Sequence, residues 1–227
     1  MSKQPAIIVP DGCSKVLLHA CCAPCSSAIV EWLLAHGIEP VIYYYNPNIY
    51  PQEEYEIRKN ESKRHAASLG ITWIDDDSGE GLQVTDYGER HRAWLCAMQG
   101  LESEPERGRR CERCFYVRLL ATARKAQEAG IGWFATTLAS SRWKNLEQIN
   151  RAGKAAEDTV RAERLPVTGY VAPKFWAQNW RKDGLQERRN ALLKEYGFYN
   201  QQYCGCEFSA GRMTACTEQD VTDGPDL

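Results

Sequence analysis

Residues 15–27 read KVLLHACCAPCSS, and this stretch decides how the chain folds. The apolar run at 16–18 is typical of a buried strand. After it, Pro24 marks a change to helical spacing, in which apolar side chains recur every three or four residues. Open α/β folds keep their sites at such strand-loop-helix junctions, beyond the carboxyl ends of parallel strands. We therefore predict a functional site in this loop, which holds three cysteines within five residues.

The rest of the chain alternates short β-branched or aromatic segments with longer helical ones. Composition and periodicity predict strands at 39–45, 71–74 and 132–138. They predict helices at 51–69, 83–98, 111–129, 145–161 and, interrupted at Asp183-Gly184, 175–196. Strands separated by helices of about 12 or more residues form βαβ units, so the sheet should be mainly parallel. The expected fold is a Rossmann-like α/β domain with a helical C-terminal half.

The composition is that of an ordinary globular protein, with 43% hydrophobic and 26% charged residues among 227. We expect a single catalytic α/β domain at 15–208. It lies between an N-terminal tail (1–14) and a polar C-terminal tail (209–227). The first residues are too short and polar for a signal peptide, and no apolar run approaches the about 20 residues that span a membrane. We therefore expect a cytoplasmic protein with no membrane partner. The net charge of -2 argues against a generally attractive surface for nucleic acid but allows local basic patches.

The chain contains ten cysteines, most of them in clusters. In a reducing compartment such thiols are metal ligands or redox groups rather than a disulfide framework. The clustered ones are Cys21, Cys22 and Cys25, then Cys111 and Cys114, then Cys204 and Cys206. We interpret the other three, Cys13, Cys96 and Cys216, as packed or exposed free thiols. Simple packing is also the alternative for the first cluster, but adjacent thiols at a site-forming turn favour a function.

Cys111 and Cys114 begin a predicted helix, in the sequence GRRCERC. The free N–H groups and the dipole at a helix N-terminus favour thiolate over thiol. Together with Cys21 and Cys22 they make four thiolates, a set that both zinc and iron–sulphur clusters accept. Structural zinc usually takes two spaced pairs, so the adjacent cysteines favour an iron–sulphur cluster.

Cys204 and Cys206 are separated only by Gly205. A disulfide between them would close a small, strained ring, and strain raises the reduction potential, as a redox-cycling pair requires. Glycine tolerates the tight backbone of such a ring. A further pair of metal ligands is the alternative.

Six motifs together resemble the cobalamin-independent epoxyqueuosine reductases of the QueH type, over about residues 17–206. They are LLHACCAPCS, NPNIYPQEEYEIR, RCERCFYVRL, TTLASSRWKN, WRKDGL and YGFYNQQYCGC. The resemblance implies that the protein reduces the epoxide of epoxyqueuosine, in the wobble position of a tRNA anticodon, to queuosine. One departure is Arg142-Trp143, where the family pattern has a small residue and a tyrosine.

The resemblance also implies cofactors, partners and site residues. A 4Fe-4S cluster would be held by Cys21, Cys22, Cys111 and Cys114, with Cys25 as the candidate ligand of one additional iron. Cys204 and Cys206 would form a redox-active disulfide. The substrate partner would be tRNA carrying epoxyqueuosine, and the sequence does not identify the electron donor. Candidate proton donors, for each of which packing is the alternative, are His19, Tyr50, Tyr116 and Tyr203.

For tRNA binding, basic and aromatic side chains of the second half are candidates. Phosphate contacts are expected from Lys144, Arg181, Lys182, Arg188 and Arg189, and base stacking from Trp143, Trp176 and Trp180. The alternative is an amphipathic surface helix with buried tryptophans.

Two other functions remain open from the sequence. One is a zinc-stabilised tRNA-binding module without catalysis. The other is an ATP-dependent tRNA-modifying enzyme, because ATP pyrophosphatases share this beginning and the expected fold is adenine nucleotide alpha hydrolase-like. Those enzymes bind pyrophosphate with a glycine-containing Ser-Gly-Gly loop, whereas residues 19–25 read HACCAPC. Without glycines, backbone N–H groups cannot converge on a phosphate, which argues against ATP use.

Overall fold

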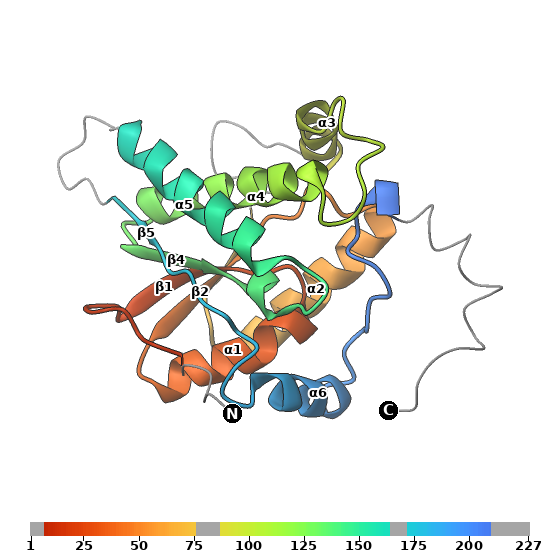
Figure 1. Ribbon diagram of the computed structural model, residues 1–227. Helices are drawn as coiled ribbons and strands as arrows, with labels where there is room; N and C mark the ends of the chain where they lie inside the picture. The colour runs from red at the N-terminus through yellow and green to blue at the C-terminus, as the bar shows by residue number, and fades with distance from the viewer. Residues whose placement is uncertain (1–6, 76–86, 164–171, 210–227) are drawn as a thin grey trace, which may run out of the picture.

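A parallel sheet of five strands organises the computed structural model, which describes residues 7–75, 87–163 and 172–209 (Figure 1). Its strands are β1 (Lys15–His19), β2 (Glu39–Tyr44), β3 (Trp73–Asp75), β4 (Trp133–Thr136) and β5 (Lys174–Phe175). They lie in the order β3-β2-β1-β4-β5, and every neighbouring pair is parallel. The predicted α/β fold with a mainly parallel sheet is confirmed.

Helices cover both faces of the sheet. They are α1 (Ala23–Ala35), α2 (Gln52–Ser68), α3 (Tyr87–Ala97), α4 (Arg109–Glu128), α5 (Leu146–Ala162), α6 (Leu185–Glu195) and the short 3-10 helix η1 (Thr137–Ser140). Helices α4 and α5 pack together on one face, and α1 and α6 pack together on the other (Figure 1). The strand order reverses between β1 and β4, so the carboxyl ends of these two strands flank a topological switch point, where open α/β sheets bind ligands.

Burial on both faces explains the sequence of β1. Val16, Leu17 and Leu18 are all fully buried, as expected for a central parallel strand covered by helices on both sides. At the other side of the switch point, α5 begins at Asn145, whose side-chain oxygen accepts hydrogen bonds from the backbone N–H groups of residues 147 and 148 at 2.9 and 3.2 Å. Strand β1 and helix α5 therefore both start where the sequence predicts.

The segment after the 164–171 gap differs from its prediction. It was expected to be helical from residue 175, but residues 174–175 form the edge strand β5 and the helix begins only at Leu185. Trp176 and Trp180 are 4% and 1% exposed and pack edge-to-face at 5.1 Å between ring centroids. Their spacing of four residues mimics a helix face, yet here an irregular segment buries both. Base stacking by these two tryptophans is therefore wrong, and the packing alternative is right.

Other predictions are confirmed in part. Strand β4 ends at Thr136 because the chain turns there into η1, two residues before the predicted end. The run Asp75-Asp76-Asp77 is typical of a solvated loop, but the side chain of Asp75 is buried and pairs with Lys59 at 2.7 Å. The start of the helix predicted at 83–98, the remaining aspartates at 76–77, and Cys216 lie outside the described residues. The division into a domain and two tails stays a prediction. No helix in the described ranges is long and apolar enough to cross a membrane.

Gly153 provides a test of the packing between α5 and β5. A Cβ at this position would lie 2.3 Å from the ring of Phe175. Alanine normally stabilises a helix relative to glycine, by roughly 0.5–1 kcal/mol. Here we expect Gly153→Ala to lower the free energy of unfolding instead, by about 1–3 kcal/mol, because the ring cannot move without disturbing the sheet edge.

Denaturant unfolding measures this change, with Gly153→Ala/Phe175→Leu as the matched control. The double variant should recover part of the lost stability, because the smaller side chain makes room for the new methyl group. A Gly153→Ala protein as stable as the parent would contradict the packing described here.

Candidate metal and redox centre

The loop after β1 gathers three thiols. The Sγ atoms of Cys21, Cys22 and Cys25 all lie within 4.8 Å of one another, and Cys21 and Cys22 are separated by 3.8 Å between sulphurs. Cys22 has an extended backbone at the N-cap of α1, and Pro24 lies in the first turn of that helix. The turn from strand to helix therefore aims three neighbouring side chains into one buried place, which we call the β1-loop thiols.

His19 ties the two strands of the switch point together. Its Nδ1 lies 2.8 Å from Thr136 Oγ1 at the end of β4, and its Nε2 lies 3.1 Å from the carbonyl oxygen of Tyr45. The ring is fully buried, and burial together with the charge of Arg118 lowers the pKa of His19 to about 3. The imidazole is neutral and hydrogen-bonded on both sides, so its packing alternative fits better than proton donation.

Three further side chains hold the β1 loop in place. Thr137 accepts a hydrogen bond from the backbone N–H of Cys21 at 3.2 Å. Asn46, at the end of β2, donates to the carbonyl oxygen of Ala20 at 2.9 Å and accepts a hydrogen bond from Arg118 of α4. The loop is thus fixed by β2, by η1 and by α4 at once.

A second group of thiols lies at the start of α4. Cys114 is buried and belongs to a small apolar cluster with Cys206, Trp94 and Met98. Cys111 is half-buried, and its sulphur accepts a hydrogen bond from the backbone N–H of Arg107 at 3.2 Å. Burial raises the pKa of Cys111 in spite of that hydrogen bond. We call Cys111, Cys114, Cys204 and Cys206 together the α4 thiols.

The Cys204-Gly205-Cys206 loop is held against the segment after β2. Ile49 forms an antiparallel bridge with Cys206, and the N–H of Tyr50 donates to the carbonyl oxygen of Gly205 at 2.8 Å. Cys204 and Cys206 share a hydrogen bond, which lowers the pKa of Cys204 and raises that of Cys206. One of the two is therefore the better thiolate, and the other is the better thiol.

Lys144 interacts electrostatically with thiols of both groups. Burial acts to lower the pKa of Lys144, but the negative charges of Cys204 and Cys21 outweigh it and raise the pKa. Cys25 contributes in the same direction. A single ammonium group therefore interacts with Cys21 and Cys25, near the start of the chain, and with Cys204, near its end.

The donor set fits the cluster that the resemblance implies. Among the β1-loop thiols, hydrogen bonds from Cys22 and Cys25 lower the pKa of Cys21. Burial raises the pKa of Cys22, and the hydrogen bond with Cys21 raises that of Cys25 to about 12. These buried donors are all sulphur, as iron–sulphur clusters and thiolate zinc sites require. Cys111 and Cys114 lie outside the 4.8 Å group formed by the described residues of the β1 loop.

The candidate tRNA contacts lie on the loop after η1, in the segment between β5 and α6, and on α6. Trp143 is 67% exposed, and the guanidinium of Arg142 stacks 4.9 Å from its ring centroid. The carbonyl oxygen of Trp143 accepts a hydrogen bond from Arg107 Nε at 2.8 Å, and Arg181 donates to the carbonyl oxygen of Lys144 at 2.9 Å. Arg181 thus binds the backbone of the loop after η1, whereas the sequence predicted that it would contact phosphate. Lys182 and Arg189 are half-buried, and Arg188 pairs with Glu31 at 2.6 Å.

Sequence reasoning missed several residues that contact the thiols. Gln201, within the YGFYNQQYCGC motif, donates to Cys22 Sγ at 3.0 Å. It lies in an irregular segment, where no helical or strand period predicts the direction of its side chain. Arg118, in contrast, follows Cys114 by four residues and Cys111 by seven on the same helix, so the helical period predicts that it faces the same way. Arg118 could therefore have been found.

An all-parallel α/β sheet with three clustered thiols at its switch point defines a class of protein with the donor set for a cysteine-bound metal. Comparison with known proteins agrees. The family model described as "Epoxyqueuosine reductase QueH" matches residues 16–212. This chain belongs to the QueH family of epoxyqueuosine reductases, which are oxidoreductases.

Individual relatives named "Epoxyqueuosine reductase QueH" cover most of the chain. That of Haemophilus influenzae is 43% identical over 201 residues, which are 88% of this chain and 74% of the relative. That of Acinetobacter baylyi is 42% identical, over 88% of this chain and 83% of its own length. That of Thermotoga maritima is 34% identical, over 86% and 89% respectively. The similarity therefore spans the whole described site.

Gly205 allows a test of how the Cys204–Cys206 loop is held. Its φ is 93°, a conformation that favours glycine, and a Cβ there would lie 2.8 Å from the side chain of Ile49. We expect Gly205→Ala to cost about 1–3 kcal/mol locally and to loosen the loop. Cys204 and Cys206 should then react faster with a thiol-modifying reagent, as mapped by mass spectrometry.

Gly130→Ala is the matched control, because Gly130 also has a positive φ, 65°, but an added Cβ would meet nothing within 4 Å. It should leave the labelling of Cys204 and Cys206 unchanged. Equal labelling of these cysteines in Gly205→Ala and in the parent would show that Ile49 does not hold the loop.

Proposed function

We propose that this protein reduces the epoxide of epoxyqueuosine, in the wobble position of a tRNA anticodon, to queuosine. The observation that carries the proposal is the group of three thiols at the switch point of the fold, which the C-terminal segment reaches through the hydrogen bond from Gln201 to Cys22 Sγ at 3.0 Å. Membership of the QueH family supplies the reaction. A tRNA substrate agrees with the cytoplasmic location that the sequence predicts.

The reaction needs two electrons and two protons, because opening an epoxide to an alkene releases its oxygen as water. Two thiols that become a disulfide release the same two electrons and two protons. We assign this role to Cys204 and Cys206, whose shared hydrogen bond gives one thiolate and one thiol. A donor outside this chain then reduces the disulfide again.

We assign the remaining clustered thiols to iron. The proposed ligands of a 4Fe-4S cluster are Cys21, Cys22, Cys111 and Cys114, with Cys25 as the ligand of an additional iron. When bound, such a centre supplies electrons one at a time and a Lewis acid for the departing oxygen. The side chains of the protein hold it dry: the β1-loop thiols are buried, and Trp94 and Met98 pack around Cys114.

In the loop that follows η1, the neighbouring side chains of Trp143 and Lys144 have different proposed roles. Lys144 turns inward, where its charge interacts with Cys204 and Cys21. This geometry supports charge balance at the thiols more directly than the phosphate contact predicted from sequence. Trp143 turns outward and offers an exposed ring for a base of the anticodon loop. Arg181 positions both side chains by donating hydrogen bonds to the carbonyl oxygens of Ser141 and Lys144. Lys182 remains a proposed phosphate contact.

The zinc-stabilised binding module is the second candidate, because the same thiols would suit zinc. Membership of the QueH family of epoxyqueuosine reductases favours the reductase. An ATP-dependent enzyme is less well supported, because the loop after β1 contains no glycine to approach a phosphate.

The experiment that tests the function is anaerobic turnover. Protein purified without oxygen is given a chemical reductant and tRNA carrying epoxyqueuosine, and the nucleosides are then analysed by mass spectrometry. We expect iron in the protein and conversion of epoxyqueuosine to queuosine. A zinc-only protein that binds the tRNA without converting it would establish the binding module instead.

Serine variants should separate the two proposed roles of the thiols. Cys111→Ser and Cys114→Ser should lose iron, because each removes a proposed ligand. Cys204→Ser and Cys206→Ser should keep the iron of the parent while sustained turnover falls by at least about a hundredfold, because the dithiol is gone. Iron analysis and multiple-turnover assays on the same samples measure both. Iron loss in the second pair would make Cys204 and Cys206 ligands, against the proposal.

Trp143 should contribute to tRNA affinity through stacking. A base stacked on an aromatic side chain is worth about 1–3 kcal/mol, so Trp143→Ala should weaken tRNA binding by about 5- to 150-fold. Trp143→Tyr should lose much less, since it keeps a flat ring. Both variants should retain the parent's iron content, because residue 143 does not contact the thiols. Unchanged affinity of Trp143→Ala would refute the stacking role.

A further inference from the structure

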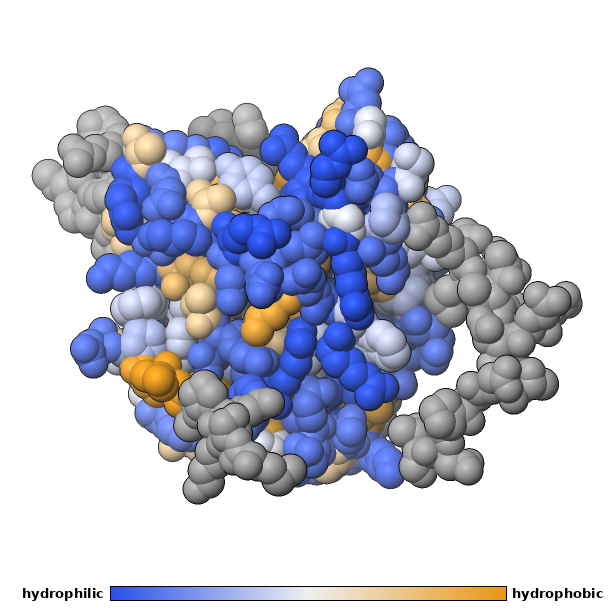
Figure 2. Space-filling view, in the orientation of Figure 1, coloured by the Kyte–Doolittle hydropathy of each residue, from blue (hydrophilic) through white to orange (hydrophobic). Residues whose placement is uncertain are grey.

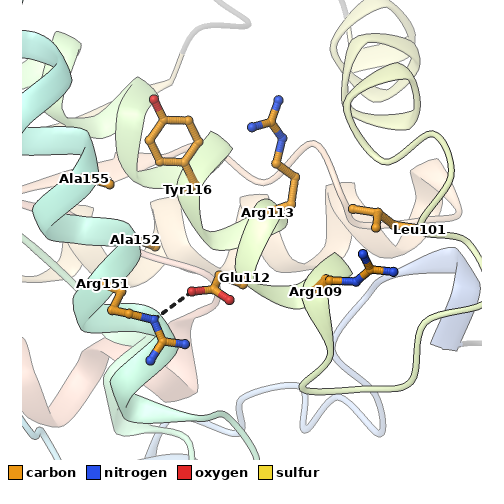
Figure 3. A pocket seen from close by; sticks show the side chains of 8 residues that line it. All are labelled: Leu101, Arg109, Glu112, Arg113, Tyr116, Arg151, Ala152 and Ala155. Atoms are coloured by element: carbon orange, nitrogen blue, oxygen red, sulfur yellow. Dashed lines mark hydrogen bonds and ion pairs between the residues drawn. The ribbon is translucent and has the colours of Figure 1, made fainter.

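A basic hollow lies between α4 and α5, on the outside of the molecule. It has a volume of about 420 Å³, and its walls are formed mainly by Arg109, Arg113, Tyr116, Arg151, Ala152 and Ala155 (Figure 3). Figure 2 shows that hydrophilic side chains predominate over this side of the molecule. None of these residues belongs to the thiol centre or to the tRNA contacts assigned above.

The hollow carries a surplus of positive charge. Arg151 pairs with Glu112 across the two helices at 2.9 Å, and Arg109 pairs with Glu104 at 2.6 Å. Arg113 is exposed and, within the described ranges, has no carboxylate partner; its guanidinium lies 5.8 Å from the ring centroid of Tyr116. In Figure 3 the side chains of Arg113 and Tyr116 project to the same side of α4. The hollow therefore presents an unpaired guanidinium beside an aromatic ring.

Helix geometry places the hollow directly behind the thiols. Arg109, Arg113 and Tyr116 follow one another at spacings of four and three residues, so they share the outer face of α4. Cys111 and Cys114 lie on the opposite, inner face of the same two turns. A helix with its side chains is only about 10–12 Å thick, so a strand whose reactive base enters the thiol centre passes close to the hollow.

Arg107 joins this region to Trp143. Its carbonyl oxygen accepts a hydrogen bond from Gln148 in the first turn of α5 at 2.7 Å, and its Nε donates to the Trp143 carbonyl oxygen at 2.8 Å. The exposed ring and the hollow are therefore fixed to the same junction of α4 and α5. An anticodon loop needs both a ring for its unstacked bases and cations for its phosphates.

We propose that this hollow binds the phosphate backbone of the tRNA next to the epoxyqueuosine nucleotide, with Arg113 as its main contact. The proposal rests on the proposed function for the identity of the RNA. A concave site with two small alanines, Ala152 and Ala155, lets a sugar–phosphate chain lie close to the helices. An acidic protein donor would reach exposed arginines without a hollow and would not use the exposed ring of Trp143, so the RNA backbone fits better.

Charge reversal at Arg113 tests the proposal, with tRNA carrying epoxyqueuosine as the probe. Arg113→Glu should weaken tRNA binding by about tenfold or more, and Arg113→Ala should reduce the salt dependence of binding by about one phosphate contact. Arg113→Lys should stay within about threefold of the parent, because it keeps the charge. Arg64→Glu on α2, across the sheet, is the matched control with the same change in charge, and it should bind normally.

Two further measurements decide between outcomes. Iron content should equal that of the parent in all four variants, since none of these residues contacts a thiol. Arg113→Glu that binds tRNA like the parent, or that loses no more affinity than Arg64→Glu, overturns the proposal. The proposal is also overturned if Arg113→Glu binds tRNA normally but its disulfide is reduced more slowly by a protein electron donor. Failure of the parent to convert epoxyqueuosine would overturn the proposed function separately, since that assay needs no variant.

Discussion

Buried negative charge on the thiols is the constraint on which the rest of this site depends. Removing a thiolate from water costs several kcal/mol unless a cation or hydrogen-bond donor compensates it. Lys144 supplies that compensation to Cys204 and Cys21 together, and Arg118 extends it from α4. The thiols, the lysine and the arginine come from distant segments, so the centre exists only when the whole sheet and both of its helical layers have formed.

Helix α4 joins buried chemistry to recognition at the surface. Its inner face carries Cys111 and Cys114 toward the other thiols, and its outer face forms one wall of the basic hollow. The loop at 141–144 repeats this division, with Lys144 inside and Trp143 outside. In the function that we propose, the tRNA is held outside the protein while a single base reaches the buried thiols. This arrangement keeps solvent away from the thiolates.

Local sequence predicted most of the fold because the central strands are buried on both faces and therefore apolar throughout. The loop at 19–25 was recognisable as a candidate site because adjacent thiols follow directly after such a strand, where packing alone was the alternative. The edge strand β5 was missed, because two residues carry no periodicity and the tryptophans that follow imitate a helix face. Gln201 and the inward direction of Lys144 depend on tertiary contacts, which spacing along the chain does not reveal.

The central claim is that the electrons for the epoxide pass through Cys204 and Cys206. It is tested most directly by a single turnover without external reductant. Reduced protein is mixed anaerobically with one equivalent of tRNA carrying epoxyqueuosine, and the reaction is stopped by alkylation. The account predicts that queuosine and a Cys204–Cys206 disulfide form in equal amounts, as counted by mass spectrometry of the tRNA and the peptides. Queuosine formed while both cysteines remain fully alkylated would contradict it.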